Sequence, residues 1–109
     1  MFDRTSNRIY VSGKITGLPR EEYMANFERA EAELTKQGYV VLNPAKVGDG
    51  MPESTTWEEY MELCICMLRM CSKIYLPENW TDSRGALVEL EYAKTYGYEV
   101  IEEAANEQD

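Results

Sequence analysis

One glutamate stands out by its surroundings. Glu89 lies among apolar residues in the run DSRGALVE, four residues after Gly85, so the two share one face of a helix that starts near Ser83. Helical side chains point back toward the helix start, which directs this carboxylate toward the preceding loops. A carboxylate in partly apolar surroundings can be the nucleophile of a glycosyl-type reaction. The alternative interpretation is ordinary solvated helix surface, where most glutamates lie.

Two short polar motifs are candidates for holding a ligand beside that carboxylate. In YVSGKITG, Gly13 and Gly17 bracket a turn whose backbone amides could face an anion or a sugar, although the same spacing fits a plain strand-to-helix turn. In DSRG, Asp82 or Ser83 can cap the helix, and Gly85 allows a ligand to approach the backbone closely.

Two aromatic residues have two interpretations each. Tyr10, at the end of the first predicted strand, could orient a carboxylate or touch a sugar ring, or it could simply be packed in the core. Trp80, in the loop before the last helix, could stack a nucleobase or cover the core.

Composition limits the chemistry that is available. The chain of 109 residues contains no histidine, so acid–base chemistry must use a carboxylate, a tyrosine, a thiol or the substrate itself. The three cysteines, Cys64, Cys66 and Cys71, fit neither a disulfide framework nor a metal site, because C-x-C-x4-C on a helix cannot converge on one ion. No metal or cofactor is therefore expected, and reduced thiols indicate the cytoplasm.

Charge limits the class of partner. The 20 acidic residues outnumber the 11 basic ones, and the formal net charge is −9. This balance argues against a nucleic-acid polymer, whose phosphates are bound by clustered Lys and Arg, but not against one small phosphate held at a helix start. Neither a signal peptide nor a membrane span is predicted, since no sufficiently long apolar run is present.

Strand-like and helical segments alternate along the chain. Strands are predicted at residues 8–13, 39–44, 73–77 and 98–101, and helices at 19–38, 55–71 and from Ser83 to near Gly97. The helix at 55–71 is expected to open on a capping box of Thr55 and Glu58 and to bury a stripe that includes Trp57, Tyr60, Met61 and Cys64. The loop at 45–54 is expected to be exposed and mobile, and the acidic tail at 102–109 to fray.

This alternation predicts a single α/β domain over residues 1–109, with a parallel sheet covered by helices on both faces. The predicted architecture is a flavodoxin-like or Rossmann-like three-layer fold of four to five strands in the order 2-1-3-4. Ligands of such sheets bind where loops leave the carboxyl ends of the strands. Those loops are SGKITGLP, NPAKVGDG and PENWTDSRG.

The segments IYVSGKITG, NPA, IYLPENW and DSRGALVELEYAKTYG together resemble a small bacterial and phage family of the DUF4406 type, within the nucleoside 2-deoxyribosyltransferase-like superfamily. That superfamily includes 2'-deoxynucleoside 5'-monophosphate N-glycosidases. The resemblance implies that the glutamate of S-x-G-x-x-x-E, formed here by Ser83, Gly85 and Glu89, attacks C1' of a deoxyribose. It places the enzymes' aromatic-x-x-G-x-I-x-G loop on Tyr10, Gly13, Ile15 and Gly17, with Tyr10 beside the nucleophile and the loop at the 5'-phosphate.

The chain departs from these enzymes at the aspartate that helps to protonate the leaving base. Cys64 and Ser72 occupy the nearest positions, and a thiol with its ordinary pKa near 8.5 stays mostly protonated.

Two interpretations therefore stay open. One is an enzyme that cleaves or transfers at the N-glycosidic bond of a nucleoside or its monophosphate, with Glu89 as nucleophile and Tyr10 orienting it. The other is a nucleotide-binding module that keeps the pocket without the chemistry. A structural protein without a ligand fits the three polar loops poorly, and the resemblance implies a homodimer or a higher homo-oligomer. The candidate sugar, base or phosphate contacts are Ser12, Gly13, Lys14, Ile15, Thr16, Gly17, Asn43, Trp80, Ser83, Arg84 and Gly85.

Overall fold

The computed structural model describes residues 7–103. Four strands form one parallel sheet in the order β2-β1-β3-β4. Their bounds are β1 Arg8–Val11, β2 Val40–Leu42, β3 Lys73–Leu76 and β4 Glu99–Glu102. The predicted fold class and strand order are confirmed, and each strand is shorter than or shifted from its predicted range by a few residues.

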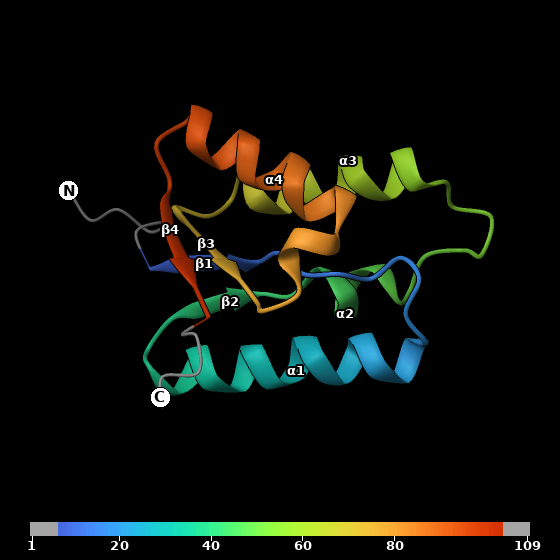
Figure 1. The fold of residues 1–109 in the computed structure, drawn as a ribbon, viewed down its shortest axis with the longest axis horizontal. Helices are drawn as coiled ribbons and strands as arrows, with labels where there is room; N and C mark the ends of the chain where they lie inside the picture. The colour runs from blue at the N-terminus through green and yellow to red at the C-terminus, as the bar shows by residue number, and fades with distance from the viewer. Residues whose placement is uncertain (1–6, 104–109) are drawn as a thin grey trace.

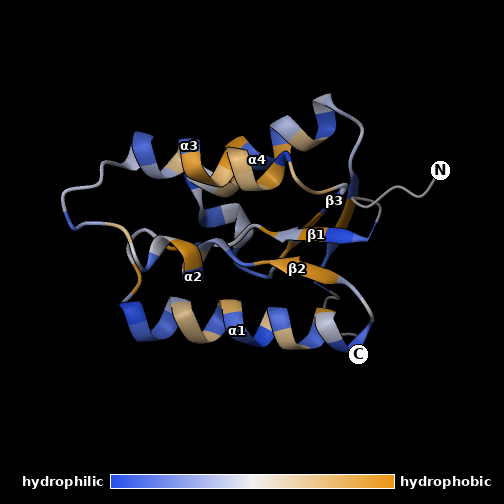
Figure 2. Cartoon of the chain, turned by 180° about the vertical axis from the view of Figure 1, so that it is seen from behind, coloured by the Kyte–Doolittle hydropathy of each residue, from blue (hydrophilic) through white to orange (hydrophobic). Residues whose placement is uncertain are grey.

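Helices cover both faces of the sheet, as Figure 1 shows. Helix α1, Arg20–Lys36, lies on one face, and helices α3, Trp57–Leu68, and α4, Arg84–Thr95, lie together on the other. A short helix α2, Pro44–Gly48, follows β2, and a 3-10 turn η1, Trp80–Asp82, leads into α4. In Figure 2, hydrophilic and hydrophobic residues alternate along α1, as expected for a helix with one face in solvent.

The alternation of side chains along β1 divides the core into two clusters. Ile9 and Val11 pack with Phe27 and Leu34 of α1, whereas Tyr10 packs with residues of α3 and α4 such as Leu68. Successive residues of a strand face opposite sides of the sheet, so Ser12 shares the side of Tyr10. The first strand therefore directs the two hydroxyl groups of Tyr10 and Ser12 toward α4.

Only the two central strands are fully covered. The last three residues of β1 and of β3 are buried, but Val40 at the start of β2 is 54% exposed and Val100 in β4 is 38% exposed. This exposure follows from the strand order, because β2 and β4 are the two edge strands of the sheet.

Three local predictions need correction. The segment predicted to be a mobile loop begins with helix α2, because Asn43 caps it and Pro44 occupies its first turn. The capping box of α3 uses Thr56 and Glu59, one residue later than predicted. The predicted tail is shorter at its start, since residue 102 belongs to β4 and the amide of Glu103 donates to the carbonyl of Leu76. Residues 104–109 lie outside the described range.

The close contact between α2 and α3 gives a stability prediction. A Cβ atom placed on Gly48 would lie 2.3 Å from a ring carbon of Tyr60, whose hydroxyl donates to the carbonyl of Pro44 at 3.0 Å. The substitution Gly48→Ala must therefore displace this ring, and we expect it to lower the free energy of unfolding by about 1–2 kcal/mol. Urea denaturation measures the change.

The matched control is Gly50→Ala, because the nearest atom to its Cβ would be 3.8 Å away. We expect this control to change the stability by less than about 0.5 kcal/mol. Equal stabilities of the two variants would show that the ring of Tyr60 moves aside at no cost, contrary to the packing described.

No helix within residues 7–103 is both long and apolar enough to cross a membrane.

Candidate functional site

The candidate site lies at the carboxyl ends of β1 and β3. In the sheet, β2 lies on one side of β1, and β3 lies on the other side. The direction in which the chain adds strands therefore reverses between β1 and β3. In open parallel sheets, ligands bind in the crevice at such a switch point. The loop after β1 and the start of α4 meet at this crevice.

Helix α4 places Glu89 in the crevice. Ser83 begins this helix as its N-cap, with its hydroxyl accepting a hydrogen bond from the amide of Ala86 at 3.1 Å. Glu89 follows in the second turn and is only 4% exposed. This burial excludes solvated helix surface as the explanation of Glu89.

Two hydroxyl groups from β1 hold the carboxyl group of Glu89. The phenol of Tyr10 donates to Oε2 at 2.6 Å, and the hydroxyl of Ser12 donates to Oε1 at 2.6 Å. All three side chains are buried. Each carboxyl oxygen therefore has one short hydrogen bond from a strand in the centre of the sheet.

Burial sets the protonation of this group. It raises the pKa of Glu89 from 4.5 to about 7, because an ionised carboxylate loses hydration there, while the hydrogen bonds from Ser12 and Tyr10 act in the opposite direction. Burial, followed by the charge of Glu89, raises the pKa of Tyr10 well above its ordinary value. Near neutral pH, Tyr10 is thus a donor and Glu89 exchanges between its acid and its base form.

A thiol lies beside this pair. Cys64 of α3 is 2% exposed, and burial followed by the charge of Glu89 raises its pKa to about 12. Burial likewise raises the pKa of Tyr60, one turn earlier on α3, above its ordinary value. Both groups are therefore neutral at physiological pH, and the thiol of Cys64 is a weak acid.

A cavity of about 50 Å³ adjoins Glu89. Its wall includes the predicted site residues Tyr10, Gly13, Ile15, Thr16, Ser83, Gly85 and Glu89. Ligand pockets usually measure about 300–1,000 Å³. The cavity is therefore smaller than a typical ligand pocket.

The start of α3 forms one part of the cavity wall. Trp57, Tyr60 and Met61 line the cavity from this helix, and the guanidinium of Arg84 lies 3.9 Å from the centre of the Trp57 ring. This cation–π contact joins the first turn of α3 to the first turn of α4 across the mouth of the crevice. Met61 is the most adaptable of these side chains because it is unbranched and flexible.

The other predicted contacts lie outside the cavity wall. The hydroxyl of Ser12 donates to Glu89, and the guanidinium of Arg84 lies over the ring of Trp57. Trp80 packs against the core on the α3 and α4 side of the sheet. Lys14 is half-buried and does not line the cavity either. Gly17 is exposed and has a φ of +89°, so a turn explains this glycine.

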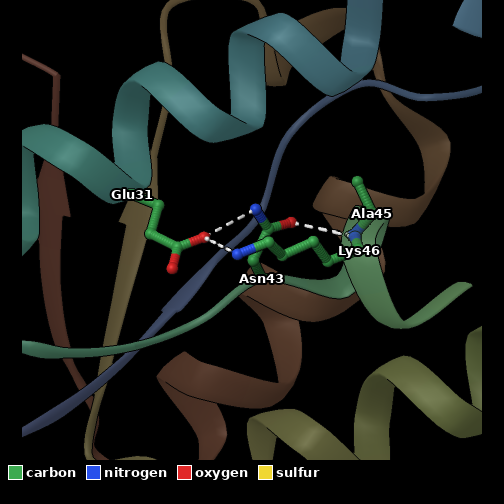
Figure 3. Close-up of polar contacts among 4 residues, drawn as sticks. All are labelled: Glu31, Asn43, Ala45 and Lys46. Atoms are coloured by element: carbon green, nitrogen blue, oxygen red, sulfur yellow. Dashed lines mark hydrogen bonds and ion pairs between the residues drawn. The ribbon is translucent and has the colours of Figure 1, made fainter. Parts of the chain in front are cut away.

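Asn43 has a structural task, which Figure 3 shows. Its Oδ1 accepts hydrogen bonds from the amides of Ala45 and Lys46, and its Nδ2 donates to Glu31 of α1 at 3.0 Å. Lys46 also contacts Glu31, at 3.5 Å. Asn43 therefore caps α2 and fastens it to α1, and it does not line the cavity.

Sequence reasoning missed the α3 side of the cavity. Trp57, Tyr60 and Met61 were expected only as part of an apolar stripe, and helical spacing alone does not separate a core position from a pocket wall. The remaining unpredicted wall residues are Phe27, Pro44 and Ala86, and Cys64 lines the cavity as well.

A wider hollow of about 770 Å³ lies between α1 and the ends of β3 and β4. It contains none of the predicted site residues and no carboxylate that is buried. Nor do residues 7–103 place three or more His, Cys, Asp or Glu side chains together as a metal site. Among residues 7–103, Glu89 is the only acidic residue that is buried.

The sequence matches a known protein family. The model described as "Domain of unknown function (DUF4406)" matches residues 7–102. The chain belongs to this family. The matched range contains all four strands and the whole Glu89 site, so the site is part of the DUF4406 domain itself. No curated protein matches the sequence.

Proposed function

We propose that this DUF4406 protein cleaves or transfers at the N-glycosidic bond of a nucleoside, a deoxynucleoside or a nucleoside 5'-monophosphate, with Glu89 as the nucleophile. The observation that carries the proposal is one buried carboxyl group at the cavity wall, held by two hydroxyl groups and with a pKa of about 7. The resemblance of the sequence to nucleoside 2-deoxyribosyltransferases and deoxynucleotide N-glycosidases supplies the reaction class. Perturbed carboxyl groups in clefts are typical of such sites.

The proposed first step forms one bond and breaks one. A carboxylate oxygen of Glu89 bonds to C1' of the sugar, the bond between C1' and the base nitrogen breaks, and its electron pair leaves with the base. The departing nitrogen takes a proton from solvent or from a neighbouring donor. Water then hydrolyses the glycosyl ester in a hydrolase, or a second base replaces it in a transferase.

The cavity wall suggests how the sugar would lie. Gly13, Ile15 and Thr16 from the loop after β1 border the cavity, and so do Ser83 and Gly85 at the start of α4. A 5'-phosphate between them would face backbone amides and the positive end of a helix dipole. Arg84 would join these contacts only after leaving Trp57.

A second function is favoured by one observation. Cys64 stands where the resemblance places a catalytic aspartate, and its pKa of about 12 makes proton donation difficult. A binding module that sequesters or senses a nucleotide would need the cavity but no proton donor. Release of the free base separates the two functions.

We also propose an oligomeric state and a cellular location for the protein. Leu87 and Val88 on α4 are 49% and 44% exposed and follow directly on the cavity residues Gly85 and Ala86, which supports a homodimer or a higher homo-oligomer with a neighbour near the site. The three free cysteines support a reducing, cytoplasmic location.

The test is a thermal-shift panel of nucleosides and their 5'-monophosphates, with each stabilising compound then assayed for free base by chromatography. The proposed enzyme is stabilised by its substrate and releases the base. Stabilisation without release supports the binding module instead. A panel that neither stabilises the protein nor yields base rejects both.

A further inference from the structure

Ser12 has no access to the cavity, although it was expected to contact the ligand. It is 0% exposed and does not line the wall. Its amide donates to the carbonyl of Tyr75 at 2.9 Å, which extends the pairing of β1 with β3 by one residue beyond the strand. The backbone of Ser12 is thus held by the centre of the sheet, and its hydroxyl reaches only Glu89 among the described contacts.

Tyr10 and Ser12 make matching contacts. Ser12 directly follows β1 and continues its pairing with β3, so its side chain shares a face with that of Tyr10, two residues earlier. Each hydroxyl donates to a different oxygen of Glu89 at 2.6 Å. A single hydrogen bond leaves a carboxyl group free to turn about its last torsion angle. Two bonds from one strand, one to each oxygen, fix its plane.

We propose that Ser12 is a positioning residue, which holds one carboxyl oxygen of Glu89 while Tyr10 holds the other, so that the group faces the cavity in one orientation and can ionise there. The proposal rests on the proposed function only in taking the carboxyl group of Glu89 as the nucleophile. A carboxyl group with two donors keeps its ionised form accessible despite burial, because hydrogen bonds to a charged acceptor are stronger than those to a neutral one.

Hydrogen bonds from Tyr10 and Cys64 also lower the pKa of Glu89, and the one from Ser12 has the largest effect of the three. Tyr10 comes from β1, and Cys64 and Tyr60 come from α3. None of the three carries a positive charge at neutral pH, and the nearby Arg84 lies on Trp57. Loss of the Ser12 hydroxyl therefore removes one of the few contacts that favour the ionised carboxylate.

The test is the titration of Glu89 by carbon-detected NMR of glutamate carboxyl groups, with the Glu89 signal assigned by its absence in Glu89→Gln. We expect a midpoint near the pKa of about 7 in the unmodified protein. In Ser12→Ala we expect the midpoint to rise by about 1–2 pH units, the size of one hydrogen bond to a charged group. An unchanged midpoint overturns the proposal.

Two further variants keep the test decisive. The control Ser83→Ala removes another hydroxyl of the site, one that caps α4 and makes no hydrogen bond to Glu89. This variant should lower the stability of the protein and leave the Glu89 midpoint unchanged. A midpoint that rises as much in Ser83→Ala as in Ser12→Ala assigns the effect to loosened structure and overturns the proposal. If Ser12→Ala does not fold, Ser12→Cys, with a weaker donor of similar size, should give a smaller rise, and no rise overturns it.

The titration needs no substrate, so its outcome is separate from that of the nucleotide panel. A rise in Ser12→Ala with a silent panel would keep the positioning role and reject the proposed reaction. With an active substrate, the pH profile of kcat should shift to higher pH in Ser12→Ala, together with the NMR midpoint, while KM changes little.

Discussion

Replacing Glu89 by glutamine should change the free energy of unfolding by about 3 kcal/mol more favourably at pH 8 than near pH 4.5. The reason is the raised pKa of Glu89, about 7 in the folded protein against an ordinary value of 4.5. Below pH 4.5 the carboxyl group is protonated in both states, and burial costs no charge. Between pH 4.5 and 7, the unfolded chain releases this proton while the folded protein keeps it. The unmodified protein therefore loses stability as the pH rises to 7.

The measurement is urea denaturation of both proteins at pH 5, 6, 7 and 8. Exchange of the hydrogen bonds in the glutamine variant adds an offset that does not depend on pH, so the decisive quantity is the slope of the difference against pH. The control Glu91→Gln makes the same change on an exposed residue of the same helix and should give a flat difference. A flat difference for Glu89→Gln as well would contradict the burial of an ionisable group at this site.

The same substitution should abolish turnover. Because glutamine cannot bond to C1' as a carboxylate does, we expect Glu89→Gln to slow the release of base by at least about a thousandfold. Binding should change much less, since the glutamine occupies the same volume and keeps a hydrogen-bonding contact with Tyr10 or Ser12. Chromatography of the released base gives the rate, and the thermal shift with the same nucleotide gives the binding.

The matched control for the loss of turnover is Glu91→Gln. Glu91→Gln should release base at the unmodified rate, because Glu91 is exposed and lies outside the cavity wall. If Glu89→Gln instead released base normally, the nucleophile would be water or another group. If it released no base and also failed to bind, the role of Glu89 would be in holding the ligand.

The fold could be predicted because it depends on repeated local signals. Apolar strands that alternate with helices, and polar loops at their carboxyl ends, led to the parallel sheet and its site edge. Boundaries were less certain where two patterns overlap. In TTWEE, both Thr55 with Glu58 and Thr56 with Glu59 fit a capping box, and the structure has the second pair.

The site was predicted in part for the same reason. Glu89 and Tyr10 were recognisable from position, since Glu89 lies one turn inside a helix that follows a polar loop and Tyr10 lies near the carboxyl end of a strand. The contacts of Ser12 and Arg84 were not, because a hydrogen bond to Glu89 and a stack on Trp57 join residues far apart in the chain. The signal for Asn43 was present, since Asn before Pro is a typical helix start, and it indicated a cap more strongly than a ligand contact.

The most direct test of the account is the mass of the protein after an acid quench during turnover of a nucleotide that the panel identifies. A covalent glycosyl intermediate predicts an added sugar, or sugar phosphate, on the peptide that contains Glu89, and no such addition in Glu89→Gln. The account would be contradicted by base release with the sugar attached to another residue, or by release that continues in Glu89→Gln without any addition.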